Sequence, residues 1–166
     1  MRSMVTGGAG FIGSHIADAL TELGHDVLVV DDLSRGKRDN VPSSADFAQV
    51  SVTSPEVEQL MADFRPQAVF HLAAQMDVRR SVADPAFDAK TNVEGTVRVA
   101  SAAARAGCEG FFFASTGGAI YGEQESFPAG EDHPCRSESP YGVSKRCAEI
   151  YLDYFARAGG MRTVAL

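Results

Sequence analysis

The sequence predicts an α/β fold, a doubly wound parallel sheet of the Rossmann type with helices on both faces. Three observations favour this fold. Short apolar runs alternate with longer segments of helical periodicity. Several of the runs are apolar throughout, as strands covered on both faces are, and a glycine-rich turn follows the first of them. A chain of 166 residues suits one domain with one core.

The expected elements follow that alternation. Strands are expected at residues 2–5, 26–30, 47–50, 68–72, 110–114 and 162–166, and helices at 11–23, 55–64, 85–106 and 141–158. Gly24 and Gly107 stand where helices should end, and Pro55 and Pro85 stand where helices should begin. In the last helix an apolar stripe repeats every three or four residues, and we expect it to face the sheet: Cys147, Ile150, Tyr151, Tyr154, Phe155 and Ala158.

Composition narrows the kind of partner. The formal net charge is -7, with 45% hydrophobic and 22% charged residues. An acidic chain is poorly suited to nucleic acid or anionic membranes, and no apolar run approaches the roughly 18 residues of a membrane span. We therefore expect a soluble protein that binds a small molecule, with no nucleic acid and no membrane as partner.

The cysteines and the N-terminus bear on the compartment. Cys108, Cys135 and Cys147 lack CxxC spacing, which indicates neither a disulfide framework nor a zinc site, and the histidines suggest no other metal site. The first strand runs directly into the glycine-rich turn, without the charged and apolar regions of a signal peptide. The expected location is the cytoplasm.

The glycine-rich turn carries the first chemical motif, with glycines at Gly7, Gly10 and Gly13 between a strand and a helix. One glycine permits a positive φ, one lets the backbone approach a pyrophosphate, and one lets the helix pack on the strand. The N-terminus of the following helix offers free N–H donors to phosphates. In this context the turn predicts a dinucleotide site rather than a plain glycine-rich turn.

An acidic residue ends the second strand, as a dinucleotide site requires. The carboxylate of Asp31 can accept hydrogen bonds from the adenosine ribose, and together with Asp32 it would repel a 2′-phosphate. The sequence therefore favours NAD over NADP. The alternative rests on three nearby cations that could pair with such a phosphate, Arg35, Lys37 and Arg38.

A second constellation opens the last helix. Tyr141 and Lys145 are four residues apart, so they share one helix face. An ammonium group one turn from a phenol favours the phenolate, and we expect it to lower the pKa of Tyr141 enough for a general base. By spacing alone a surface tyrosine and lysine would be the plainer interpretation, but the dinucleotide turn favours the catalytic one.

Six motifs, in order along the chain, resemble those of the extended short-chain dehydrogenase/reductases, and within them the nucleotide-sugar epimerases of the UDP-glucose 4-epimerase type. Their ranges are 6–15, 31–36, 71–75, 92–96, 115–122 and 139–145. The resemblance implies that Tyr141 is the acid/base, that Lys145 tunes its pKa and anchors the ribose, and that Thr116 or Ser115 binds the substrate oxygen. The cofactor-binding positions that it implies, beside the glycines and aspartates above, are Phe11, Ile12, Ser34, Gly36, Ser51, Val52, Leu72, Ala73, Ala74 and Asn92.

The implied reaction is inversion at C4 of a nucleotide-linked hexose through a transient 4-keto sugar, with NAD kept bound. Related dehydratases need an acid and a base just after the threonine, where this chain has Gly117 and Gly118, so elimination of water is disfavoured. An NAD-dependent sugar dehydrogenase or reductase remains an alternative within the enzyme class.

Enzymes of this kind usually run to roughly twice this length and bind the nucleotide sugar with a C-terminal domain. The resemblance therefore implies that residues 1–166 form the NAD-binding Rossmann domain and that the C-terminal substrate domain is absent. A catalytically incomplete dinucleotide-binding module is accordingly a second hypothesis. A homodimer or a complementing C-terminal chain would be its protein partner.

Other polar residues receive plainer interpretations. His71 ends an apolar strand and is expected to be a hydrogen-bonded core histidine. The loop at 75–81, with Arg79 and Arg80, lies at the ligand edge, and we expect it to be structural or solvated.

Overall fold

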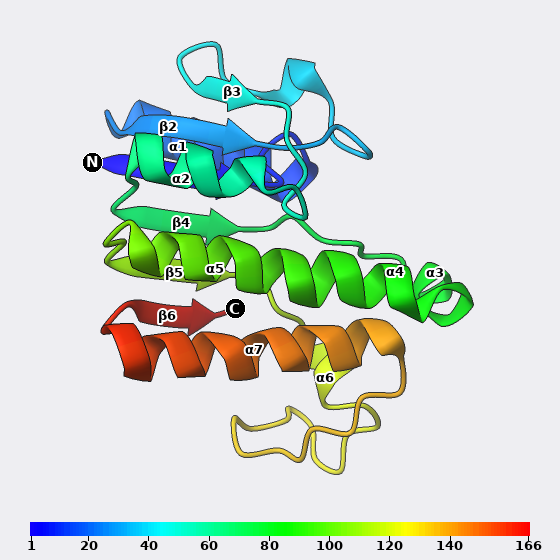
Figure 1. Cartoon of the computed structure of the whole chain (residues 1–166). Helices are drawn as coiled ribbons and strands as arrows, with labels where there is room; N and C mark the ends of the chain where they lie inside the picture. Colours follow the sequence, from blue (N-terminus) through cyan, green and yellow to red (C-terminus); the bar gives the residue numbers. More distant parts are fainter.

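The computed structural model describes all 166 residues and confirms the predicted fold. Its six-stranded sheet has the order β3-β2-β1-β4-β5-β6, and every neighbouring pair is parallel (Figure 1). The strands are β1 (Arg2–Thr6), β2 (Asp26–Val30), β3 (Asp46–Ala48), β4 (Ala68–His71), β5 (Gly110–Phe113) and β6 (Arg162–Ala165). The chain reverses its direction of winding between β1 and β4, where sheets of this kind bind ligands.

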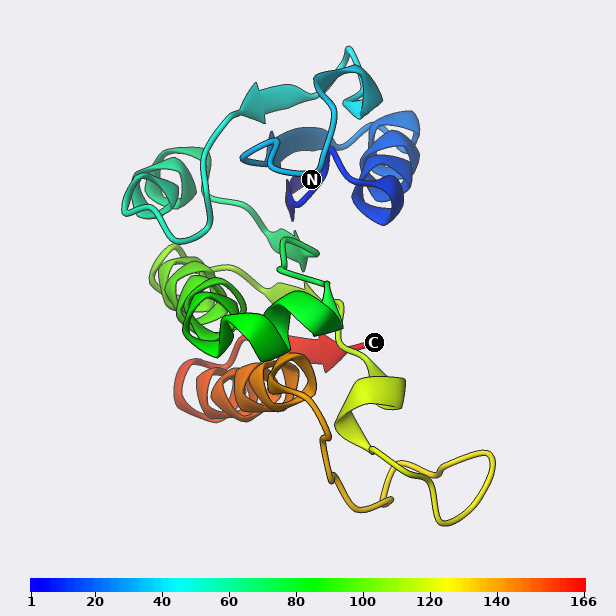
Figure 2. The ribbon, with the colours of Figure 1, turned by 90° about the vertical axis from the view of Figure 1, so that its right-hand side faces the viewer.

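Helices cover both faces of the sheet. They are α1 (Phe11–Glu22), α2 (Glu56–Phe64), α3 (Val78–Ala83), α4 (Pro85–Ala89), α5 (Gly95–Arg105), α6 (Gly117–Ile120) and α7 (Pro140–Gly159), with a 3-10 turn at Arg38–Asn40 and a π turn at Lys90–Glu94. Figure 2 shows α1 on one face and α2, α5 and α7 on the other. None of these helices has the length and apolar character needed to cross a membrane.

The two faces carry separate hydrophobic cores. The larger lies under α2, α5 and α7 and includes Phe111 and Phe113 of β5, which are fully buried. The smaller lies under α1 and includes Val5 and Val29. Because β5 alternates its side chains, Phe112 points to the α1 side, where it stacks on Phe70 with 4.8 Å between ring centroids.

The helix predicted at 85–106 is continuous but contains the π turn. Pro85 occupies the first turn of α4, as predicted, and the Asp84 side chain caps it by accepting the N–H of Phe87. Within the π turn, the carbonyl of Asn92 accepts a hydrogen bond from the Thr96 hydroxyl at 2.7 Å. The wider turn is thus stabilised by a side chain of the same helix, at a position that often marks a functional region.

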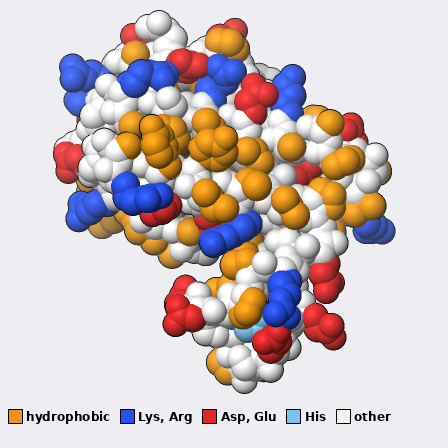
Figure 3. Space-filling view, turned by 60° about the horizontal axis from the view of Figure 1, so that its bottom comes forward, with side chains coloured by type: hydrophobic (Ala, Val, Ile, Leu, Met, Phe, Trp, Pro, Cys, Tyr) orange, Lys and Arg blue, Asp and Glu red, His pale blue; other side chains and the backbone are white.

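The predicted orientation of the α7 stripe is wrong for most of its residues, although Phe155 packs against the larger core. Ile150, Tyr151 and Tyr154 are 56%, 46% and 57% exposed, whereas the buried residues of α7 are Gly142, Ser144, Lys145, Ala148 and Leu152. Most of these are small, because the helix packs closely on its neighbours: a Cβ at Gly142 would lie 2.3 Å from the carbonyl oxygen of Ala119. Figure 3 shows the resulting gathering of hydrophobic side chains on the surface that carries α7.

Candidate functional site

The glycine-rich turn between β1 and α1 is packed too tightly for side chains at two positions. Gly7 has a φ of +70°, and a Cβ there would lie 2.6 Å from the backbone nitrogen of Ala73. A Cβ at Gly13 would lie 2.2 Å from the carbonyl oxygen of Gly7. The turn therefore requires glycine at both places in order to bring α1 against β1 and the loop after β4.

The N-terminus of α1 faces outward with free donors. Gly10 is its N-cap residue, no side chain caps it, and its first turn has no acidic residue. The side chains of Phe11 and Ile12 are 81% and 62% exposed. An uncapped helix N-terminus of this length combines unpaired N–H groups with the positive end of the helix dipole, which suits an anion such as a phosphate.

Asp31 joins the turn to the loop after β2. One carboxylate oxygen accepts the N–H of Ala9 at 3.0 Å, and the other accepts the N–H of Leu33 at 2.8 Å. A Cβ at Gly36 would lie 2.8 Å from the Cβ of Ala9, so glycine lets the two loops meet. Each Asp31 oxygen keeps a second lone pair that can accept a hydroxyl.

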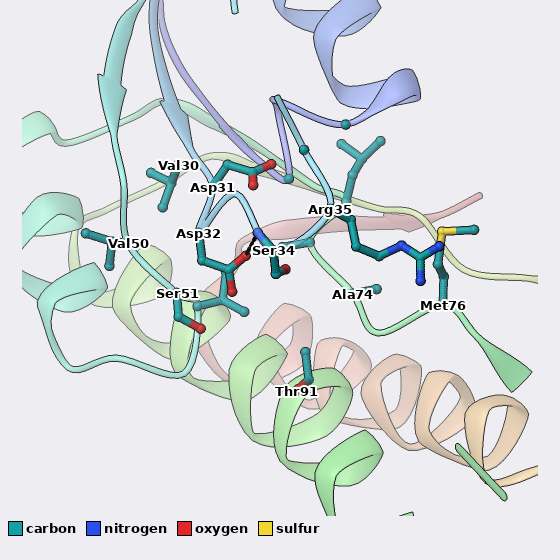
Figure 4. Close-up of a pocket in the computed structure, with 16 residues that line it drawn as sticks. Val30, Asp31, Asp32, Ser34, Arg35, Val50, Ser51, Ala74, Met76 and Thr91 are labelled. Carbon is teal, nitrogen blue, oxygen red and sulfur yellow. Dashed lines mark hydrogen bonds between the residues drawn. The ribbon is translucent and has the colours of Figure 1, made fainter. Parts of the chain in front are cut away.

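A pocket with about 680 Å³ of open space lies between these loops at the carboxyl ends of β1, β2 and β4 (Figure 4). Most predicted cofactor-binding residues line it: Gly7, Gly10, Asp31, Asp32, Ser34, Gly36, Ser51, Val52, Leu72, Ala73 and Ala74. Figure 4 shows the Arg35 side chain extended across the pocket toward Met76. Beyond the predicted set, the lining also includes Val30, Arg35, Val50, Met76 and Thr91.

Asn92 does not line this pocket. Its side chain instead holds the loop after β4 in place by hydrogen bonds. Its amide nitrogen donates to the carbonyl of Gln75 at 2.8 Å and to the Oδ1 of Asp88 at 3.0 Å, while its Oδ1 accepts the N–H of Gln75 at 2.9 Å. The side chain of Gln75 completes the clamp by donating to Asp88 Oδ1 and to the Asp77 carbonyl, each at 2.9 Å. The loop at 75–81 is therefore tied to the π turn rather than solvated throughout.

His71 is a hydrogen-bonded core histidine, as predicted. Its Nδ1 lies 2.7 Å from the Thr6 hydroxyl and its Nε2 lies 3.0 Å from the Thr96 hydroxyl. Burial, together with the smaller effect of the nearby Lys145 charge, lowers the pKa of His71 to about 3. The ring is thus neutral, and it connects the end of β1 to the start of α5.

The structure brings Tyr141 and Lys145 to the carboxyl end of β5. Ser139 caps α7 by accepting the N–H of Gly142 at 3.2 Å, and Tyr141 donates its own N–H to the Ser81 hydroxyl at 3.2 Å. The ammonium of Lys145 is buried, donates to the Ala114 carbonyl at 2.8 Å and lies 4.6 Å from the centroid of the Phe113 ring.

The electrostatics of this pair differ from expectation. The pKa of Tyr141 is raised, first by burial and then by the carboxylate of Asp88. Burial lowers the pKa of Lys145 to about 8, against the opposing effect of Asp88 and Glu149. The Lys145 nitrogen lies 5.9 Å from the centroid of the Tyr141 ring and is bonded to a carbonyl instead, so the predicted lowering of the tyrosine pKa is wrong.

The two candidate hydroxyls after β5 differ in whether they are hydrogen-bonded within the chain. Ser115 donates to the Oε1 of Glu149 at 2.5 Å, and the other oxygen of Glu149 accepts from Arg146 at 2.9 Å. The Thr116 hydroxyl makes no hydrogen bond within the chain, not even to the helix α6 that it precedes. Both residues line a second pocket with about 1500 Å³ of open space, together with Tyr121, Arg146 and Glu149.

The chain combines a doubly wound parallel sheet with a glycine-rich turn after β1 and a Tyr-x-x-x-Lys helix after β5. These features define the Rossmann-type class of α/β proteins. The family is shown by direct comparison: residues 3–166 match the model of the "NAD dependent epimerase/dehydratase family", and the chain belongs to that family.

The chain is similar to proteins named UDP-glucose 4-epimerase. The chain is 44% identical over 160 residues to that of Mycolicibacterium smegmatis, covering 93% of this chain and 51% of that protein. It is 38% identical over 163 residues to a putative one of Methanocaldococcus jannaschii, covering 98% of this chain and 53% of that protein. The chain thus spans about half the length of the curated relatives that it matches.

Solved structures agree in fold. The UDP-glucose 4-epimerase of Thermotoga maritima, solved with UDP-glucose, has a TM-score of 0.97 at 46% identity, over 99% of this chain and 54% of that one. The UDP-glucose 4-epimerase of Thermus thermophilus, solved with NAD, has a TM-score of 0.95 at 46% identity, again over 99% of this chain and 54% of that one.

Proposed function

We propose that this chain is the NAD-binding part of a nucleotide-sugar 4-epimerase that interconverts sugars of the UDP-glucose and UDP-galactose type. One observation carries the proposal: an anion-binding turn and a Tyr141–Lys145 pair lie at the same edge of one sheet, in a chain whose relatives are named UDP-glucose 4-epimerases. The substrate partner is therefore a nucleotide sugar.

The residues present fit NAD. The uncapped N-terminus of α1 would hold the pyrophosphate, and Gly10 leaves it room because a Cβ there would be in contact only with the Gly7 carbonyl. The spare lone pairs of Asp31 would accept the ribose hydroxyls. Val30, Val50 and Val52 give the pocket an apolar wall suited to an adenine ring.

Asn92, Phe11, Ile12 and Gly13 have less direct roles in this proposal. Phe11 and Ile12 offer backbone N–H groups rather than side chains, and Gly13 lets α1 approach β1. Asn92 orders the loop that carries Ala73 and Ala74. The proposed NAD site is thus built from backbone on one side and from Asp31 on the other.

In the proposed reaction Tyr141 takes the proton of the C4 hydroxyl, and Thr116 holds the C4 oxygen. A bound NAD would supply reversible hydride transfer at C4, which is the chemistry that the chain's own residues cannot provide. Tyr141 then gives back its proton, so the reaction balances without net oxidation. We assign the oxygen-binding role to Thr116 rather than Ser115, because the Ser115 hydroxyl is already committed to Glu149.

Titration with NAD and NADP tests the cofactor. We expect NAD to bind more tightly, because Asp31 and Asp32 line the proposed pocket and their carboxylates would repel a 2′-phosphate there. Arg35 lines the same pocket, so Arg35→Ala is the matched variant: it should weaken any binding of NADP more than that of NAD. Equal or tighter binding of NADP to the wild-type chain would contradict the role of Asp31.

Tyr141→Phe tests the chemistry in a full-length protein that carries these residues. It keeps the ring but removes the proton relay, so turnover should fall by about 10²–10⁴-fold while NAD affinity changes little. An unimpaired variant would refute the mechanism.

The second candidate function is a module that binds NAD but does not turn over a nucleotide sugar by itself. It is favoured by the observation that the chain spans about half the length of its relatives. Incubating the chain with NAD and UDP-galactose separates the two, because only the epimerase produces UDP-glucose. NADH formed in step with sugar consumption would instead favour a dehydrogenase or reductase.

The protein partner is a second copy of the chain or a complementing C-terminal chain, and the exposed apolar face of α7 supports association. The proposed compartment is the cytoplasm, in keeping with the free thiols of Cys108, Cys135 and Cys147.

A further inference from the structure

Two carboxylates and one ammonium group are buried in this chain. The carboxylates are Asp31 and Asp88, and the ammonium belongs to Lys145. Both oxygens of Asp31 accept backbone N–H groups. Asp88 is different: it is fully buried, yet its Oδ2 has no hydrogen-bond partner. A buried carboxylate that lacks such partners needs another source of stabilisation.

Asp88 is held in place from one side. Its Oδ1 accepts hydrogen bonds from Gln75 Nε2 at 2.9 Å and from Asn92 Nδ2 at 3.0 Å. These donors lie on the loop after β4 and on the π turn. The helix α4 that carries Asp88 packs against α7, which carries Tyr141 and Lys145. The carboxylate is therefore fixed beside the helix of the proposed catalytic pair.

Lys145 is a buried ammonium group that has no negatively charged hydrogen-bond partner. Its ammonium touches the Ala114 carbonyl and the Phe113 ring, and neither bears a formal negative charge. The titratable groups that act on it or lie nearest are Asp88 from α4, Glu149 and Tyr141 from α7, and His71 from β4. His71 is neutral, and Glu149 is engaged by Ser115 and Arg146.

We propose that Asp88 is a positioning residue whose buried carboxylate is the counter-charge of the Tyr141–Lys145 pair. It keeps Lys145 protonated and opposes ionisation of Tyr141. The catalytic meaning of this role rests on the proposed function: Tyr141 must hold a proton while the sugar is in its keto form, and a nearby carboxylate stabilises that state. Asp88 favours a protonated Tyr141 and a protonated Lys145 at the same time.

Asp88→Asn tests the charge while preserving the contacts, since the amide oxygen can still accept from Gln75 and Asn92. NMR with labelled tyrosine and lysine follows the ionisation of both groups, because the chain has 4 tyrosines and its lysines are Lys37, Lys90 and Lys145. We expect the titration midpoints of Tyr141 and Lys145 both to shift downward. Asp153→Asn, which removes a charge from the exposed face of α7, should shift neither.

Glu149→Gln sharpens the test. Glu149 raises the pKa of Lys145 but does not act on that of Tyr141, so this variant should lower the lysine midpoint alone. Unchanged midpoints in a folded Asp88→Asn chain would overturn the proposal. A tyrosine midpoint that follows Glu149 rather than Asp88 would also overturn it.

A wild-type measurement decides the matter if Asp88→Asn does not fold. The carboxyl carbon shift of Asp88 reports its charge at pH 7, and a protonated carboxyl would overturn the proposal. These measurements need neither nucleotide nor turnover. A chain that fails to bind NAD would therefore contradict the proposed function without affecting the role of Asp88. Unchanged midpoints in Asp88→Asn would contradict that role without affecting the proposed function.

Discussion

Gly13 lies where the start of α1 packs against the glycine-rich turn after β1. Because a Cβ there would lie 2.2 Å from the Gly7 carbonyl oxygen and 2.8 Å from the Gly8 Cα, alanine would force the backbone of the turn apart. We expect Gly13→Ala to lower the free energy of unfolding by about 1–3 kcal/mol, measured by urea unfolding. Gly118→Ala is the control, since a Cβ there meets nothing within 4 Å, and its effect should stay within about 0.5 kcal/mol.

The hydrogen bonds of His71 define its tautomer. The single proton of the Thr96 hydroxyl goes to the Asn92 carbonyl, so Nε2 of His71 must donate to Thr96 and Nδ1 must accept from Thr6. Protonation would place a second donor against the Thr6 hydroxyl. The neutral ring is therefore part of the fold rather than a proton carrier.

A pH dependence of stability follows from the pKa of His71, which is about 3 in the folded chain. Between that value and the ordinary value near 6.5 the unfolded chain binds one more proton, so stability rises with pH and is lost as pH falls from about 6.5. We expect this histidine to contribute a slope of at most about 1.4 kcal/mol per pH unit. Urea unfolding between pH 7 and pH 5 measures the slope.

His71→Gln should remove that contribution, whereas replacing the exposed His15 in the same way should keep it. The same slope in the wild-type chain and in His71→Gln would mean that other groups cause the pH dependence.

At the residue scale, the sequence predicted which residues form the site better than it predicted their pKa shifts. The spacing of Tyr141 and Lys145 placed them on one helix face, and the glycine spacing located the turn. The direction of the tyrosine pKa was wrong, because burial and Asp88 determine it and both depend on how α4 meets α7. Asp88 itself was missed. Its signal was weak, an acidic residue four positions before Asn92 and so on the same helix face.

The π turn between α4 and α5 depends on one hydroxyl. Thr96→Val would remove the hydroxyl's bond to the Asn92 carbonyl and leave the His71 Nε2–H without a partner inside the core. We expect a loss of about 1–3 kcal/mol per unsatisfied group in the free energy of unfolding. Thr96→Ser keeps the hydroxyl and loses a methyl group, so its loss should be smaller, about 1 kcal/mol. Equal losses for the two variants would show that packing of the methyl group, not the hydroxyl, stabilises the turn.

Long elements were predictable and short ones were not. The strands and the main helices follow hydrophobic periodicity, and the punctuation agreed: Gly24 and Gly107 both end helices with a φ of +77°. Helices α3 and α6 are only 6 and 4 residues long and carry no clear period. Asp77 was an available signal for α3, because its side chain caps the N–H groups of Arg79 and Arg80.

The orientation of α7 failed for a general reason. An apolar stripe marks the face that is buried in the mature assembly, but it does not say whether the sheet or another molecule buries it. Here small residues such as Ser144 and Ala148 are buried, and bulky apolar residues such as Ile150 and Tyr154 are exposed. The exposed apolar stripe of α7 therefore indicates a surface through which the whole molecule contacts another one.

At the scale of the whole molecule, the sheet divides the chemistry. The carboxyl ends of β1, β2 and β4 form the pocket that we propose for NAD. Ser115 and Thr116 follow the carboxyl end of β5, and Lys145 of α7 bonds to the Ala114 carbonyl beside them. Buried polar groups connect the two halves: His71 ends β4, the strand between them, and bonds to both Thr6 and Thr96. We therefore expect a substitution in one half to affect the other half through the hydrogen bonds of His71.

Self-association through α7 is the prediction that concerns the assembled molecule. Ile150, Tyr151 and Tyr154 are about half exposed on one helix face, and aromatic and aliphatic side chains of that size stabilise interfaces when they are removed from water. A second copy of the chain offers a self-complementary apolar surface, because a two-fold axis brings the same face to both sides of the contact. We expect the chain to dimerise, as sedimentation velocity over a range of concentrations would show.

Tyr154→Glu should shift that equilibrium toward the monomer, because it would bury a charge in the contact without touching the sheet-facing residues of α7. Val82→Glu places the same charge at another exposed apolar residue, on α3, and should leave the equilibrium unchanged. A wild-type chain that stays monomeric at every concentration, with its α7 face still exposed to hydrogen exchange and dye binding, would leave a C-terminal chain as the partner. A dimer that both variants weaken equally would contradict a contact confined to the outer face of α7, since α3 would then contribute as much.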